Sequence, residues 1–203
     1  MAGHLRNRAL QLKEQRPGYA TLLDFYVAIR EAQQESKPRV RVVSAKPANG
    51  HTAKPAFPLI GDAGFPVDIK SSVSLFDELC RLGNTANPYL ANQVKSIKRA
   101  VADGKLDLEA LLAGGGREGT IDQAAINQGL DAQVLLFLVV NSTRPSIEAA
   151  RDQLLKGFKS EGWRECSCPV CSAPPVLGLL EGDPARRHSL CSYCGCQWRV
   201  DRV

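Results

Sequence analysis

Apolar residues recur at intervals of three and four along most of the first 160 residues, which is the spacing of one face of an α-helix. Leucine and alanine at this spacing predict a helix over residues 3–15. A second helix is predicted from Tyr19, where Tyr19, Leu22 and Tyr26 share helical spacing and Pro38 ends the pattern.

Residues 37–70 break this pattern. They contain five prolines and the turn-forming pair Asn49-Gly50, and they predict a long irregular connection. Within it, the stretch RVRVV at residues 39–43 alternates polar and apolar residues as a strand does, although the sequence offers no obvious partner strand.

Helical spacing returns after residue 70. The first helix there is predicted to begin at a Ser71 or Ser72 cap and to stop at Gly83. The next opens with Asn87, a capping residue followed by proline, and closes at Gly104.

Three further helices are predicted before residue 160. A short one starts at Asp107, and residues 131–141 form one that is apolar nearly all round, as buried helices are. The last is expected to be separate, because Ser142 or Thr143 can cap a new helix just ahead of Pro145.

Six of the seven cysteines lie in two C-terminal clusters, CSCPVC and CSYCGC. Four of them follow the pattern C-x2-C-x19-C-x2-C, which is typical of a four-sulfur metal site. Two thiolates three residues apart on a tight turn can grip one face of a tetrahedral ion, and a second turn closes the other face. The sequence therefore predicts one metal ion held by Cys168, Cys171, Cys191 and Cys194, with zinc and iron both open.

The residues around these cysteines predict a small β module. Two hairpin strands fit between the knuckles, with the bend at residues 181–184, and the alternating tail places Trp198, Val200 and Arg202 on one side of a third strand. About forty residues bury too little apolar surface to fold alone, so a bound metal supplies the missing free energy.

The predicted fold class is therefore mainly α. A bundle-like helical domain spans residues 1–160, and a four-cysteine module of zinc-ribbon or rubredoxin type spans residues 161–203.

Cys166 and Cys196 are not needed for a four-sulfur shell, and their role is open. As small apolar side chains they would fill space beside the site. As reactive thiols they would exchange with a ligand or undergo redox chemistry, which requires exposure and a lowered pKa.

The charge distribution, the length of the apolar runs and the motifs present limit the classes of function that the sequence supports. The basic excess lies in residues 1–60, whereas residues 164–203 carry five basic against four acidic side chains. Four thiolates on a divalent ion would make the module negative, so nucleic-acid binding is not expected. The longest apolar run, residues 134–140, is too short to cross a bilayer. We find no catalytic motif, so a non-enzymatic protein in the cytoplasm is expected.

The order of these features resembles the FdhE family of formate dehydrogenase accessory proteins. A helical region precedes CPVCSAPPV and then LCSYCGCQWRVDRV. The positions that match the family pattern are Cys168, Pro169, Val170, Cys171, Pro175, Leu190, Cys191, Cys194, Trp198, Arg202 and Val203.

The resemblance implies a cytoplasmic factor that helps mature a molybdenum- or tungsten-dependent formate dehydrogenase and binds its catalytic subunit. It also implies a rubredoxin-like, iron-containing module on the same four cysteines. The sequence departs from the family in two ways: family members continue with two further knuckles after the Arg-Val pair, and Ser172 stands where they usually have glycine.

We expect Tyr193, Trp198 and Arg199 to form the surface that contacts the partner, because aromatic and arginine side chains often anchor interfaces. Two alternatives stay open at this point. The chain could be a nucleic-acid-binding zinc ribbon, or a thiol or iron redox protein.

Overall fold

The computed structural model describes residues 2–42, 58–60, 64–116, 119–156, 163 and 165–200. The chain divides into two compact units. Unit 1 contains Met1–Arg41 and Val67–Pro145, and unit 2 contains Val42–Pro66 and Ser146–Val203. The boundary predicted at residue 160 lies within unit 2.

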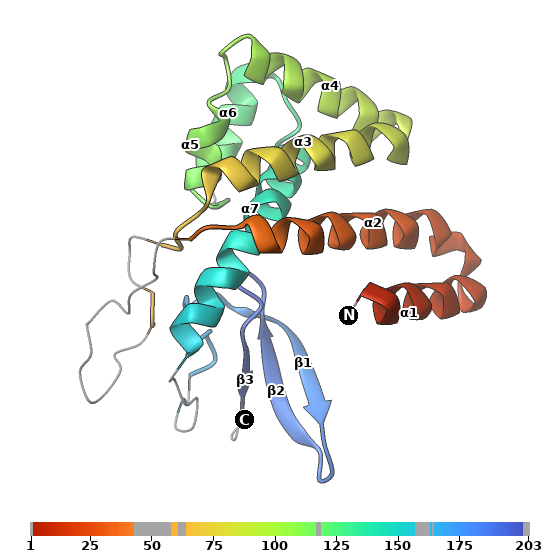
Figure 1. Cartoon of the computed structure of the whole chain (residues 1–203), viewed down its shortest axis with the longest axis vertical. Coiled ribbons are helices and arrows are strands. Elements are labelled where there is room, and N and C mark those ends of the chain that lie inside the picture. The colour runs from red at the N-terminus through yellow and green to blue at the C-terminus, as the bar shows by residue number, and fades with distance from the viewer. Residues whose placement is uncertain are drawn as a thin grey trace. The chain divides into compact units, whose positions relative to one another are not determined.

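The described residues form a mainly helical chain that ends in a small sheet, as the sequence predicted (Figure 1). The helices are α1 (Ala2–Gln15), α2 (Ala20–Ser36), α3 (Ile69–Ala86), α4 (Pro88–Ala102), α5 (Leu108–Ala113), α6 (Thr120–Gln128) and α7 (Ala132–Leu155), with short 3-10 helices at Pro17–Tyr19 and Lys37–Arg39. The strands are β1 (Pro175–Glu181), β2 (Arg186–Cys191) and β3 (Gln197–Arg199).

Much of the irregular connection predicted over residues 37–70 lies outside the described residues. The described part of the stretch RVRVV forms no strand, because Arg39 ends a 3-10 helix and residues 40–42 have no regular structure. Residues 40–42 therefore agree with the irregular connection predicted over residues 37–70. An alternating pattern does not make a strand unless a partner strand supplies hydrogen bonds.

Helices α1 and α2 both form where the sequence placed them. The buried face of α2, however, is not the one that its aromatic residues suggested. Tyr19, Leu22 and Tyr26 are 60 %, 61 % and 49 % exposed, whereas Ile29 and Gln33, one to two turns later, are buried. Helical spacing shows which residues share one face of α2, but it does not show which part of that face is covered by other elements of the fold.

Helix α3 begins earlier and ends later than predicted. The carboxylate of Asp68 accepts a hydrogen bond from the Ser71 N–H, so Asp68 is the cap that had been assigned to a serine. Gly83 does not stop the helix. It is buried inside α3, and a Cβ there would lie 3.1 Å from a methyl carbon of Val94, so this glycine lets α3 and α4 approach closely.

Other local signals are confirmed. The Asn87 side chain accepts from the Leu90 N–H at the start of α4, and Asp107 caps α5 in the same way. Gly104 lies after the end of α4 with a φ of 69°, in the left-handed region. Helix α6 was not predicted from the sequence.

The structure corrects the prediction of two helices on either side of residue 142. Helix α7 is continuous, with Pro145 inside it. The hydroxyls of Ser142 and Thr143 do not cap a new helix. They donate to the carbonyl oxygens of Leu138 and Val139, one turn earlier.

Gln33 explains how α7 tolerates its proline. Because Pro145 has no N–H, the carbonyl of Asn141 loses its usual donor in the helix. The buried Gln33 amide donates to that oxygen at 2.9 Å. Although α7 has a markedly apolar first half, no described helix has the length and apolarity needed to span a bilayer.

Unit 2 contains the three-stranded antiparallel sheet, in the order β1-β2-β3. The hairpin and its bend at residues 181–184 are confirmed, and β3 pairs Trp198 with Ser189 of β2. Arg202, expected on the same side as Trp198, lies outside the described residues. The core of this unit joins residues of the knuckles, β3 and the second half of α7 with Leu59, Ile60 and Phe65.

Candidate metal centre

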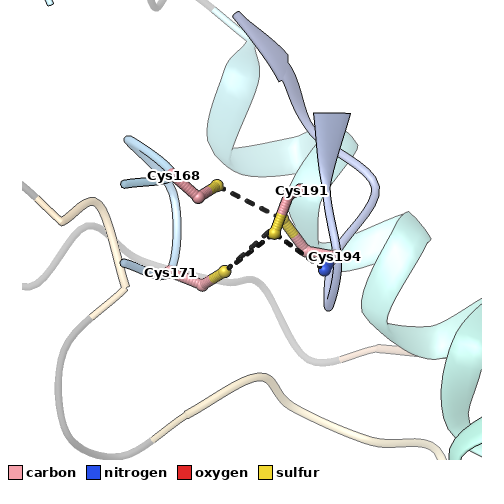
Figure 2. Close-up of side chains that lie close together, drawn as sticks. All are labelled: Cys168, Cys171, Cys191 and Cys194. Atoms are coloured by element: carbon pink, nitrogen blue, oxygen red, sulfur yellow. Dashed lines mark hydrogen bonds between the residues drawn. The ribbon is translucent and has the colours of Figure 1, made fainter. Parts of the chain in front are cut away.

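Four cysteine sulfurs converge between the two knuckles (Figure 2). The Sγ atoms of Cys168, Cys171, Cys191 and Cys194 all lie within 4.8 Å of one another. Three of the distances, Cys168–Cys194, Cys171–Cys191 and Cys171–Cys194, are 3.6 Å. A disulfide would bring two sulfurs to about 2.05 Å, so these are four separate thiols.

This spacing fits a tetrahedral metal ion. With metal–sulfur bonds of about 2.3 Å, neighbouring ligand atoms of a tetrahedron lie about 3.8 Å apart. The observed 3.6 Å is close to that value. Three of the four cysteines are buried and the fourth, Cys171, is half-buried, so the sulfurs are largely screened from water. The donor set and its geometry therefore could hold one zinc or one iron ion.

Backbone amides already point at two of these sulfurs. The Val170 N–H donates to Cys168 Sγ at 3.4 Å, and the Tyr193 N–H donates to Cys191 Sγ at 3.3 Å. In each knuckle the donor lies two residues after the first cysteine. Such hydrogen bonds favour the thiolate form, which is the form that binds a metal.

The two knuckles have the same backbone design. In the first, the Cys168 N–H donates to the Ala173 carbonyl at 2.9 Å, and in the second the Cys191 N–H donates to the Cys196 carbonyl at 2.8 Å. The residue after each second cysteine is left-handed, with φ of 60° at Ser172 and 67° at Gly195. An L side chain is strained in this conformation, so glycine would suit position 172 better than the serine present there.

Helix α7 places a cation, Arg151, beside the second knuckle. Arg151 donates from Nη1 to the Cys194 carbonyl at 2.8 Å and forms an ion pair with Asp152 at 2.7 Å. Burial opposes the charge of Arg151, but the hydrogen bond and charge of Asp152, with the charges of Glu148 and Cys194, raise its pKa. Arg151 therefore stays positive beside a cluster that becomes negative when its thiols ionise.

The sulfurs also influence one another. Hydrogen bonding with Cys171 lowers the pKa of Cys168, and hydrogen bonding with Cys168 raises the pKa of Cys194. Four neighbouring thiols cannot all lose their protons unless a cation offsets the repulsion. A metal ion at their centre would provide that offset and deprotonate the ligands.

The three residues predicted to contact a partner have different environments. Trp198 is only 1 % exposed and belongs to the core of unit 2, so the expectation that its indole is presented on the surface is wrong. The side chain packs instead in the buried core that also contains the knuckle cysteines. Tyr193 is half-buried and its ring lies 5.8 Å from that of Phe65, while Arg199 is exposed. Partner contact stays a prediction for Tyr193 and Arg199.

The two cysteines outside the four-sulfur cluster, Cys166 and Cys196, also differ in their environments. Cys166 is exposed, whereas Cys196 is 2 % exposed and packs in the core of unit 2 outside the four-sulfur cluster. A hydrogen bond with Cys168 raises the pKa of Cys196. Burial raises the pKa of Cys80, in unit 1, to about 12. Buried thiols with raised pKa values suit packing better than redox exchange.

Sequence reasoning missed the residues that support the knuckles from a distance. Besides Arg151, the N–H groups of Leu59 and Ile60 donate to the carbonyls of Pro169 and Val170 at 3.0 and 2.9 Å. These pairs are more than one hundred residues apart in sequence. No local pattern could have indicated them.

The comparison with protein families agrees with this geometry. The model of the FdhE central domain matches residues 167–202, a range that includes both knuckles and all three strands. This part of the chain is therefore similar to the FdhE central domain. Searches of curated proteins and of solved structures found no significant match.

Proposed function

Because residues 167–202 match the central domain of the FdhE accessory proteins, we propose that this chain assists the maturation of a formate dehydrogenase by binding its catalytic subunit. The observation that supports the proposal most strongly is that the matched residues are also the ones that converge into a four-sulfur cluster. The role is non-catalytic: the chain recognises a client during assembly.

In this proposal the metal centre is a structural element of the recognition module. A bound zinc or iron ion would link the knuckles and supply folding free energy that the small core lacks. Cys168 and Cys171 hold one turn, Cys191 and Cys194 hold the other, and Arg151 holds the second turn to α7. Strand β3 then has a fixed position, which presents Arg199 to solvent.

Capture of the client tests the proposal. Formate dehydrogenase catalytic subunit is incubated with the tagged chain, and retained subunit is quantified. The wild type should retain it, and the double variant Cys168→Ser/Cys191→Ser should retain much less because the module loses its shape. Failure of the wild type to capture the subunit would refute the proposed function.

A matched pair of charge reversals tests the surface. We expect Arg199→Glu on β3 to reduce capture by about tenfold, as loss of an interface arginine commonly does. Arg186→Glu on β2, which is also exposed, should bind like the wild type. Equal capture by both variants would remove Arg199 from the proposed surface while leaving the client role intact.

Metal analysis separates the structural reading from a redox one. One zinc per chain and a colourless protein would support a structural role. Iron–thiolate absorption bands with a reversible redox couple would favour electron transfer, the second candidate. The tetrahedral sulfur geometry is compatible with both metals.

A further inference from the structure

Unit 1 contains a basic pocket that the proposed function does not use. It has a volume of about 390 Å³ and lies where the end of α2 meets the start of α3. This volume is within the range of small-molecule sites in proteins. Residues that line the pocket include Ser36, Arg39, Arg41, Asp68, Lys70 and Ser71.

The pocket has an excess of positive charge. Arg39, Arg41 and Lys70 line it, and Asp68 is the one acidic residue among the described lining residues. Arg39 and Lys70 form no ion pair with any described residue. The Arg41 guanidinium donates to the backbone carbonyls of Pro38 at 2.9 Å and Val40 at 3.3 Å, and no ion pair with a carboxylate is found for it among the described residues.

Asp68 carries one negative charge against the three positive charges, and backbone N–H groups donate to both of its carboxylate oxygens. One oxygen accepts from the Ser71 N–H at 3.0 Å, and the other accepts from the Arg41 N–H at 2.7 Å. The carboxylate thus fixes the two walls of the pocket relative to each other. It holds the Arg41 backbone against the first turn of α3.

Hydroxyl groups complete the lining. The Oγ atoms of Ser36 and Ser71 lie 3.2 Å apart, and Ser36 is buried. Guanidinium groups, an ammonium group and hydroxyls together are the donors that proteins use for phosphate oxygens. A single phosphate would occupy little of 390 Å³, so the remaining space suits a larger phosphorylated molecule.

We propose that this pocket binds the phosphate groups of a small molecule that carries a diphosphate, such as a nucleoside diphosphate. Arg39 and Arg41 contact the phosphate oxygens from one wall, and Lys70 contacts them from the other. Arg39 and Arg41 belong to the basic excess of residues 1–60, so part of that excess would serve phosphate binding. This site lies within unit 1 and does not depend on the metal centre.

Calorimetric titration of the full chain with inorganic diphosphate and with ADP, at low ionic strength, tests the proposal. The wild type should bind both, with ADP at least as tight as diphosphate. The variant Arg39→Ala/Lys70→Ala should bind at least about tenfold more weakly, since it loses two charged donors. Both residues are exposed, and thermal unfolding will verify that the fold is retained.

A matched control removes the same charge elsewhere in unit 1. Lys95 and Arg99 are exposed on α4, and Lys95→Ala/Arg99→Ala should change the affinity less than twofold. Absence of binding by the wild type would overturn the proposal. Equal weakening by both variants would also overturn it, because attraction would then come from net charge alone. Tighter binding of a short single-stranded oligonucleotide than of ADP would replace it with a nucleic-acid surface.

Discussion

Replacing Arg151 with methionine is expected to weaken the metal centre without removing any of its four sulfur ligands. The Arg151 side chain is 17 % exposed, and its guanidinium donates to the Cys194 carbonyl at 2.8 Å. Methionine can fill a similar volume but has no donor. The variant therefore leaves a carbonyl of the second knuckle without its partner and removes a positive charge beside that knuckle.

The magnitude follows from these two losses. A hydrogen bond from a charged donor, together with a buried acceptor left unpaired, contributes about 2 kcal/mol to stability. Loss of a residue that supports a metal ligand commonly lowers metal affinity by about 10- to 100-fold. Both values describe similar free energies, because tenfold corresponds to about 1.4 kcal/mol. Arg151→Lys keeps the charge and should lose less affinity than the methionine variant.

Competition with a zinc chelator measures this effect directly, and the pH of half-maximal metal release gives an independent reading. Without the nearby cation the thiolates bind protons more readily, so Arg151→Met should release metal at a higher pH than the wild type. Arg186→Met, an exposed substitution on β2, is the control and should behave as the wild type. If Arg151→Met matches the wild type in both measurements, the proposed support of the knuckle by α7 is wrong.

Three further changes test other parts of the structure. Ser172 and Gly195 both have left-handed backbone conformations, which favour glycine. Ser172→Gly should therefore raise the stability of the zinc-loaded protein by less than about 1 kcal/mol, and Gly195→Ala should lower it by about 1 kcal/mol. Denaturant titration of both variants measures these changes. Chelation of the metal should abolish the near-UV circular dichroism from the buried Trp198 while most of the far-UV helical signal persists. Gln33→Met should destabilise the protein by about 1–3 kcal/mol in thermal unfolding, since the Asn141 carbonyl then has no donor.

The metal module could be read from the sequence because its constraints are local. The spacing within each cysteine pair specifies a turn, and the bend at residues 181–184 specifies the hairpin. The environment of Trp198 could not be read in the same way. Alternation along β3 assigns side chains to two faces, but which face is covered depends on α7 and on Leu59, Ile60 and Phe65, which are distant in sequence.

The helical unit shows the same division. Asn87 and Asp107 cap helices through bonds that span three residues; the cap at Asn87 and the start of a helix at Asp107 were predicted. Gly83 was misread as a stop, because its role is tertiary. Because Gly83 has no side chain, Val94 of the neighbouring helix can pack against it. Glycine is therefore required here by the packing of two helices and not by the end of a helix.

Helix α7 shows how a distant residue can offset the local effect of a proline. Pro145 favours the end of a helix, yet α7 continues through it. Pro145 does remove a hydrogen bond from the helix, and in isolation that loss, with the accompanying steric clash, costs about 3 kcal/mol or more. The chain continues as a helix because Gln33, 108 residues earlier, donates to the orphaned Asn141 carbonyl. The part of α7 that follows Pro145 carries Arg151 and belongs to unit 2. Its residues Ile147, Ala150 and Leu154 pack in the core of that unit, so the position of this cation follows from contacts within unit 2 and not from Gln33.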